Sequence, residues 1–322
     1  MPFIQMIDVG RKVITHQIRG FLSAQTVYYL LNFNLAPRQI WITRHGESTD
    51  NLSGKIGGDS HLSPTGLRYA ADLTTFINAQ RSEWEIRQAD RAKQTHFPPL
   101  PGDASPPNPA YGGNVNNSHG ASSSESTGDP APPQNFCVWT SMLQRSIQTA
   151  QYFDEEDYDI KQMRMLDELN AGSYEGCTYD EIKRLHPEEY KLRQADKLHY
   201  RYPGAGGEGY LDVINRLRAV IVEVERMTDH ALLVGHRSIA RVLLAYFLGK
   251  KRSDVADLDC PLGMLYCLEP KPYGVDFKAY RWKGTDPGMS AGGGDGNELK
   301  PHAGFEIVPD YELKRSEVQT VC

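Results

Sequence analysis

Short apolar, β-branched runs alternate along the chain with longer segments of helical periodicity. Strands are predicted at residues 39–43, 136–140 and 231–234, with further strands at 264–268 and 277–282. Helices are predicted at about 63–79, where Ser63-Pro64 starts the helix, and at about 143–153, 210–227 and 238–248. Strands that alternate with helices predict an α/β fold, a three-layer sandwich with a mostly parallel central sheet and helices on both faces.

Two segments lack this periodicity. The stretch at about 87–134 is rich in Pro, Ser and Gly, and is predicted to be a disordered insertion in a single domain spanning 39–283. It links the end of a helix to the start of a strand, so it should emerge on the side of the sheet opposite the predicted site. Residues 284–322 are predicted to be a disordered tail. Near the start, Val13, Ile14, Ile18, Phe21 and Leu22 form an apolar stripe, which predicts a helix packed on the domain.

Composition narrows the possible functions. The net charge of -6 and a pI near 5.9 give no reason to expect nucleic-acid binding. The five cysteines include no CxxC pair, so neither a disulfide framework nor a zinc site is indicated. The start lacks the pattern of a signal peptide, and the apolar runs are too short to span a bilayer. We therefore expect a cytoplasmic protein with no membrane segment.

Basic residues follow three of the predicted strands. Ligands of such sheets bind beyond the carboxyl ends of the strands. The loops there carry Arg44-His45 in TRHGESTDN, Arg145 in TSMLQRSIQTA, and His236-Arg237 in VGHRS. Two histidines and two or three arginines can therefore converge at one edge of the sheet.

This group of residues suits phosphoryl transfer, in which catalysis consists mostly of positioning and charge stabilisation. A neutral imidazole can attack phosphorus, and Glu168 in LDELNAGSYEG is a candidate proton donor. Taken alone, each of these histidines, arginines and Glu168 would be interpreted as a structural or solvent-exposed residue. The hypothesis of phosphoryl transfer therefore depends on their occurring together. A metal site is disfavoured by the adjacent arginines and the absence of HxxH spacing, and serine hydrolysis by the absence of GxSxG.

TRHGES, TSMLQRSIQTA, the Glu168 loop and VGHRS together resemble the histidine phosphatase (phosphoglycerate mutase-like) superfamily. Within it, RHGESTDNLSGKIGGDSHLSPTG, HPEEYKLRQADKLHYRYPG and LLAYFLGK resemble the fructose-2,6-bisphosphatase domains of bifunctional kinase/phosphatases. The resemblance covers about residues 40–282. It implies hydrolysis of the 2-phosphate of fructose 2,6-bisphosphate through a phosphohistidine, without cofactor or metal.

The resemblance also implies roles for individual residues. His45 becomes phosphorylated, Glu168 donates the proton, and Arg44, Arg145 and His236 hold the transferred phosphate with help from Asn51. The implied contacts to the rest of the sugar phosphate are Gly57, Tyr179, Arg193, Lys197, Arg201, Arg237 and Arg241. Three positions depart from the family pattern: Arg237 replaces glutamine, Asn170 replaces aspartate, and Gly209 replaces serine.

Residues 1–38 resemble the end of the kinase domain that full-length relatives carry, and the rest of that domain is absent from this sequence. No GxxxxGK[ST] phosphate loop occurs, so no kinase activity is expected. Three questions stay open: whether the activity is that of another histidine phosphatase or a phosphoglycerate mutase, whether the domain is a non-catalytic scaffold, and whether the protein forms a homodimer.

Overall fold

The computed structural model describes residues 2–7, 12–32, 37–94, 135–271, 273–284 and 304–315. A seven-stranded sheet with the order β5-β4-β6-β3-β7-β8-β9 forms its centre. Strands β5, β4, β6 and β3 are parallel, whereas β7, β8 and β9 continue the sheet antiparallel. Their bounds are β3 Ile40–Arg44, β4 Phe136–Thr140, β5 Asp159–Gln162, β6 His230–Gly235, β7 Met264–Lys271, β8 Gly274–Trp282 and β9 Phe305–Val308.

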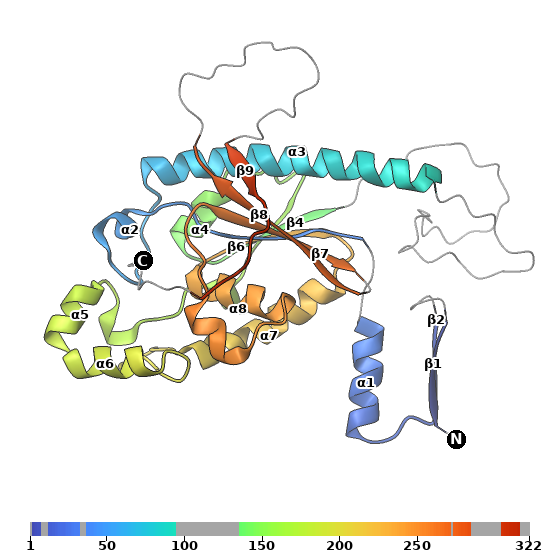
Figure 1. Ribbon diagram of the computed structural model, residues 1–322, viewed down its shortest axis with the longest axis horizontal. Coiled ribbons are helices and arrows are strands. Elements are labelled where there is room, and N and C mark those ends of the chain that lie inside the picture. Colours follow the sequence, from blue (N-terminus) through green and yellow to red (C-terminus); the bar gives the residue numbers. More distant parts are fainter. Residues whose placement is uncertain are drawn as a thin grey trace, which may run out of the picture.

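Helices cover both faces of this sheet (Figure 1). On one face lie α3 (Pro64–Gln94) and α4 (Gln144–Thr149), and on the other α7 (Tyr210–Arg226) and α8 (Arg237–Phe247). Alternation along β3 shows the two layers, since Ile40 and Ile42 pack with α7 and α8 while Trp41 packs with α3. The predicted α/β sandwich is confirmed.

The remaining elements lie outside the layers. Near the site are α2 (Thr49–Ser53), α5 (Tyr179–Leu185), α6 (Pro187–Ala195) and the short 3-10 helices η2 (Arg164–Leu166), η3 (Gly172–Tyr174) and η4 (Arg252–Asp257). In Figure 1, α5 and α6 form a projection beside α7. At the N-terminal end, β1 (Phe3–Ile7) pairs antiparallel with β2 (Lys12–His16), followed by α1 (Phe21–Asn32).

The prediction of a helix over residues 13–22 was therefore wrong. Residues 12–16 contain the β-branched Val13, Ile14 and Thr15, which suit a strand, and they pair with β1. The helix begins only at Phe21, and both Phe21 and Leu22 are exposed, at 76% and 79%.

The two segments predicted to be disordered also need correction. Helix α3 runs to Gln94, so residues 87–94 are helical, and Trp84 near its end is buried edge-on against His230. Within the predicted tail, Phe305–Val308 form β9, and Phe305 and Leu313 are buried. Residues 95–134, which hold most of the predicted insertion, lie outside the described residues.

Candidate active site

Three strands bring the basic loops together at one edge of the sheet, as predicted. Arg44 at the end of β3 pairs in register with Gly235 of β6, and Thr140 of β4 pairs with Val234. A backbone hydrogen bond of 2.9 Å from His45 N to Gly235 O continues this register into the loops. The loops after β3, β4 and β6 therefore meet.

His45 is buried, with 3% of its surface exposed. Its Nδ1 lies 2.6 Å from the Gly46 carbonyl, which can only accept a hydrogen bond, so the proton sits on Nδ1. Burial, and then the charges of Arg145 and Arg44, hold the pKa of His45 well below its ordinary value. The ring is therefore neutral near pH 7, and Nε2 keeps the lone pair that a nucleophile needs.

His236 lies behind His45, with ring centroids 5.1 Å apart and planes at 53°. It is fully buried, and its Nε2 contacts the Ser141 hydroxyl at 2.7 Å. Nδ1 accepts a 3.4 Å bond from Nε of Arg145. Burial, followed by the charge of Arg145, holds the pKa of His236 well below its ordinary value. This ring therefore orients Arg145 and does not itself line the cavity described below.

Neutral backbone acceptors hold the two arginines beside His45. Arg145, on the first turn of α4, donates from Nη1 to the Gly58 carbonyl at 2.7 Å. Arg44 donates from Nη1 to the Cys260 carbonyl at 3.0 Å, and both side chains are 4% exposed. Both guanidinium groups lie close enough to His45 to lower its pKa, and a guanidinium is suited to bind phosphate oxygens through two parallel hydrogen bonds.

Glu168 lies at the N-terminus of α8. Its carboxylate accepts hydrogen bonds from the Arg237 amide at 3.0 Å, the Ser238 amide at 3.3 Å and the Ser238 hydroxyl. The Leu169 amide donates to the same carboxylate at 2.8 Å. These four hydrogen bonds anchor the side chain at the first turn of α8. Glu168 is thus fixed at the cavity wall, where it can reach a leaving group.

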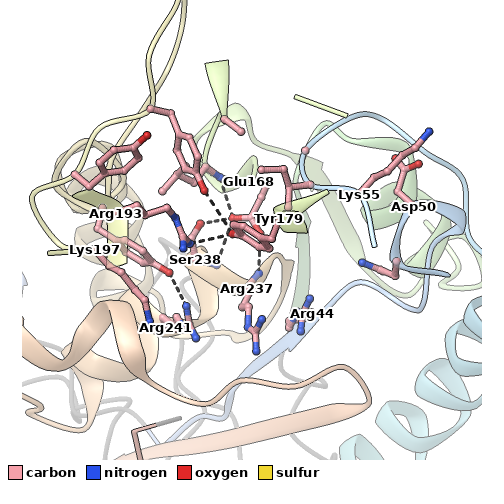
Figure 2. Close-up of a pocket in the computed structure, with 18 of the residues that line it drawn as sticks. Arg44, Asp50, Lys55, Glu168, Tyr179, Arg193, Lys197, Arg237, Ser238 and Arg241 are labelled. Carbon is pink, nitrogen blue, oxygen red and sulfur yellow. Dashed lines mark hydrogen bonds between the residues drawn. The ribbon is translucent and has the colours of Figure 1, made fainter. Parts of the chain in front are cut away.

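A cavity opens over this centre (Figure 2). Seven cationic side chains but only two carboxylates, Asp50 and Glu168, line it, so the cavity is strongly positive although the chain as a whole is acidic. The cations are Arg44, Lys55, Arg145, Arg193, Lys197, Arg237 and Arg241.

A second group of cations in the cavity comes from α6 and the turn that follows it. Arg193 on α6 donates to the Tyr179 hydroxyl at 2.9 Å, and its guanidinium lies 4.8 Å from the centroid of the Tyr179 ring and 5.7 Å from that of Tyr202. The planar guanidinium is thereby fixed by stacking and by a hydrogen bond. Lys197 pairs with Asp257 at 2.7 Å.

Arg241 of α8 donates to the Tyr210 hydroxyl at 2.7 Å and to the Leu258 carbonyl at 2.5 Å. Figure 2 shows Arg193, Lys197 and Arg241 on one side of Glu168, with Lys55 and Asp50 on the other.

The loop after His45 contributes Asn51 and Gly57. Asn51 closes a capping box with Ser48 at the start of α2, and both side chains line the cavity. Gly57 has φ +71°, and a Cβ there would lie 1.9 Å from Oε2 of Glu175. Glu175 in turn accepts from the amides of Gly58 at 2.6 Å and Ala171 at 2.5 Å, so it ties this loop to the loop of Glu168.

All the predicted site residues except His236 and Arg201 line the cavity, and His236 lies directly behind His45. Arg201 does not line the cavity; its side chain is 68% exposed, donates to the Gly207 carbonyl at 2.8 Å and pairs with Asp212 at 3.5 Å. The strand-like Tyr200–Tyr202 stretch alternates its side chains, so Tyr200 and Tyr202 face the cavity and Arg201 faces away.

Sequence reasoning missed several lining residues: Asp50, Lys55, Tyr190, Gln194, Tyr200, Tyr202, Tyr210 and Ser238. The richness of 190–210 in tyrosine was the available signal, because such side chains pack apolar faces while offering a hydroxyl. In the part of the chain that the structure describes, no group of three or more His, Cys, Asp or Glu is placed to hold a metal ion. None of the described helices is long and apolar enough to cross a membrane.

Comparison with known proteins agrees with this geometry. The family model of the histidine phosphatase superfamily (branch 1) matches residues 122–283, which contain Arg145, Glu168 and His236. The chain belongs to the histidine phosphatase superfamily. Alpha-ribazole phosphatase from Shigella flexneri has the same fold, with a TM-score of 0.51 and 17% identity over 74% of this chain and 93% of that one.

Curated relatives are more similar in sequence. 6-Phosphofructo-2-kinase 1 of Saccharomyces cerevisiae is 52% identical over 88% of this chain and 30% of its own length. A probable 6-phosphofructo-2-kinase of Schizosaccharomyces pombe is 50% identical over 88% of this chain and 43% of its own length. 6-Phosphofructo-2-kinase/fructose-2,6-bisphosphatase 3 of Rattus norvegicus is 35% identical over 85% and 39%. The chain thus spans less than half the length of these relatives.

Proposed function

We propose that this histidine phosphatase hydrolyses the 2-phosphate of fructose 2,6-bisphosphate, releasing fructose 6-phosphate and inorganic phosphate. The observation that carries the proposal is the pair of cationic groups in one cavity. His45, Arg44 and Arg145 form the reacting end, and Arg193 with Lys197 on and after α6 form a second end. A substrate with two phosphates can occupy both ends, and the tyrosines between them suit a sugar.

The proposed reaction has two steps. Nε2 of His45 attacks phosphorus, the bond from phosphorus to the sugar oxygen breaks, and Glu168 gives its proton to that oxygen. Water then attacks the phosphohistidine, the nitrogen–phosphorus bond breaks, and Glu168 takes a proton from the water. Arg44 and Arg145 neutralise the charge on the transferred group in both steps.

The names of the relatives support the choice of sugar bisphosphate. The rat relative is named for both a kinase and a fructose-2,6-bisphosphatase activity. We further propose that residues 1–38 belong to the end of a kinase domain, because the chain aligns with less than half of each such relative. The proposed compartment is the cytosol, in keeping with free thiols at Cys137, Cys177, Cys260 and Cys267.

Mass spectrometry after acid-free quenching tests the chemistry. Incubation with fructose 2,6-bisphosphate should place a phosphate on His45, and His45→Ala should carry none and show no turnover while still binding the substrate. Relative rates on fructose 2,6-bisphosphate, 2,3-bisphosphoglycerate and p-nitrophenyl phosphate test the substrate. Faster turnover of 2,3-bisphosphoglycerate would identify a mutase-like enzyme instead.

A second candidate function deserves the same test. The relatives from Saccharomyces cerevisiae and Schizosaccharomyces pombe described above are named only as kinases, which favours a phosphatase domain that binds ligand without hydrolysing it. The neutral, buried His45 and its two arginines support catalysis over this alternative. Binding of fructose 2,6-bisphosphate without phosphohistidine or turnover would support the second candidate.

A further inference from the structure

Four consecutive residues, 257–260, hold three of the cavity's cations. The Asp257 carboxylate pairs with Lys197 at 2.7 Å. The carbonyls of the next residues accept from the arginines already described, Leu258 from Arg241 at 2.5 Å and Cys260 from Arg44 at 3.0 Å. Segment 257–260 is therefore a common support for cations at both ends of the cavity.

The C-terminal segment 311–315 lies directly against this support. The Asp259 amide donates to the Lys314 carbonyl at 2.9 Å, and Leu258 forms a β-bridge with Arg315. Leu313 is buried in the core beneath, which fixes the backbone of the segment independently of its charges.

Asp257 is bonded by a cation on each of its two oxygens. Oδ1 accepts from Lys197 of the cavity, and Oδ2 accepts from Nη2 of Arg315 at 3.0 Å. Asp254 adds a second, longer contact to Arg315 at 3.6 Å. Burial by itself raises the pKa of Asp257, but the bonds from Lys197 and Arg315 outweigh it, so the pKa is lowered and the group stays ionised.

We propose that Asp257 is a positioning residue that sets how strongly Lys197 attracts an anion, and that Arg315 of the C-terminal segment tunes this strength through Asp257. The ligand's identity rests on the proposed function, with the non-reacting phosphate at Lys197. A carboxylate beside Lys197 orients the ammonium but also repels the phosphate. Arg315 draws part of that negative charge away and so favours phosphate binding.

Removal of Arg315 and removal of the charge on Asp257 should change KM in opposite directions. Arg315→Ala should raise KM for fructose 2,6-bisphosphate about two- to threefold, the size expected for a partly exposed pair. Asp257→Asn should lower KM by about threefold, since the repulsion disappears while the amide can still contact Lys197. The double variant should match Asp257→Asn, because Arg315 acts only through Asp257. Values of kcat should hardly change, since this phosphate does not react.

Lys314→Ala is the matched control. It removes a positive charge from the same segment, but the Lys314 side chain is 76% exposed, and its ion pair among the described residues is with Glu312, at 3.9 Å. Its KM should equal that of the wild type. Arg315→Lys keeps the charge and should restore the KM of the wild type. If Asp257→Asn does not fold, the comparison of Arg315→Ala with Arg315→Lys tests the proposal by itself. Salt near 1 M should reduce the effect of Arg315→Ala, because the exposed guanidinium is then screened over about 3 Å.

The proposal would be overturned if Asp257→Asn raised KM, or if Arg315→Ala changed KM no more than Lys314→Ala does. It would also be overturned if the effects of Asp257→Asn and Arg315→Ala simply added in the double variant. Absence of bisphosphate turnover in the wild type counts against the proposed function instead. In that case the dissociation constant of inorganic phosphate, measured by calorimetry, must follow the same order across the variants. Equal dissociation constants for phosphate in all the variants would overturn the proposed coupling of Arg315 to Lys197 through Asp257.

Discussion

Arg193 and Arg201 provide a test of substrate recognition, because the sequence resemblance implies that both contact the substrate beyond the transferred phosphate, whereas the structure places only Arg193 of the two at the cavity. Arg193 lines the cavity, fixed by Tyr179 and Tyr202. Arg201 points to solvent and pairs with Asp212. Replacing each by alanine removes the same charge from positions eight residues apart, one at the cavity and one outside it.

The expected changes in KM for the two variants fall in ranges that do not overlap. A hydrogen bond to a charged group contributes about 1.5–3 kcal/mol, which corresponds to roughly 10- to 150-fold in binding. Arg193→Ala should therefore raise KM for fructose 2,6-bisphosphate by this factor, with little change in kcat, because the phosphate is bound alike in ground and transition states. An exposed pair is worth about 0–1 kcal/mol, so Arg201→Ala should change KM less than about fivefold.

Steady-state kinetics on two substrates provide the assay. The monophosphate p-nitrophenyl phosphate has no second phosphate to place near Arg193, so its KM should be insensitive to both substitutions. Arg193→Lys should recover only part of the loss, since a lysine cannot reproduce the stacked, forked guanidinium. Equal losses on both substrates, or an Arg201→Ala effect as large as that of Arg193→Ala, would refute this reasoning.

Three further predictions concern the reacting centre and the stability of the fold. Arg145→Ala should lower kcat on the order of hundreds-fold, as does loss of an oxyanion donor, and a loss below tenfold in steady-state assays would place Arg145 outside the centre. Glu175→Gln should lower kcat about tenfold with melting temperature preserved, because Glu175 holds the Gly58 backbone that orients Arg145; Glu155→Gln, at an exposed site remote from the loop, is its control. His230 is buried with its pKa lowered to about 4, mainly by burial. The unfolded chain therefore takes up a proton first as pH falls below 6.5, and urea denaturation should show about 2 kcal/mol less stability at pH 5 than at pH 7 from this residue, a loss that His230→Asn should abolish.

Local sequence determined the strands and the order of the reacting groups. Runs such as QIWIT and FCVWT are short, apolar and rich in β-branched or aromatic residues, and β3 and β4 form where they occur. Since parallel strands end at a common edge, knowing three strand ends was sufficient to bring His45, Arg145 and His236 together. These inferences needed only the composition of short runs in the chain and the rule that parallel strands end at a common edge.

Tertiary structure alone decided the features that depend on distant partners. Strand β9 is only four residues long and follows a Gly-rich, polar stretch, so the sequence around it did not predict a strand. It forms because β8 offers an open edge and Phe305 packs among Tyr69 and Phe76. Lys197 and Asp257 are 60 positions apart, so no spacing in the sequence links them. Lys197 faces the cavity and Arg201 faces solvent. The direction of each side chain is set by the path of residues 196–202 between packed elements, because this segment is too short for a sequence pattern to predict which side chains face inward.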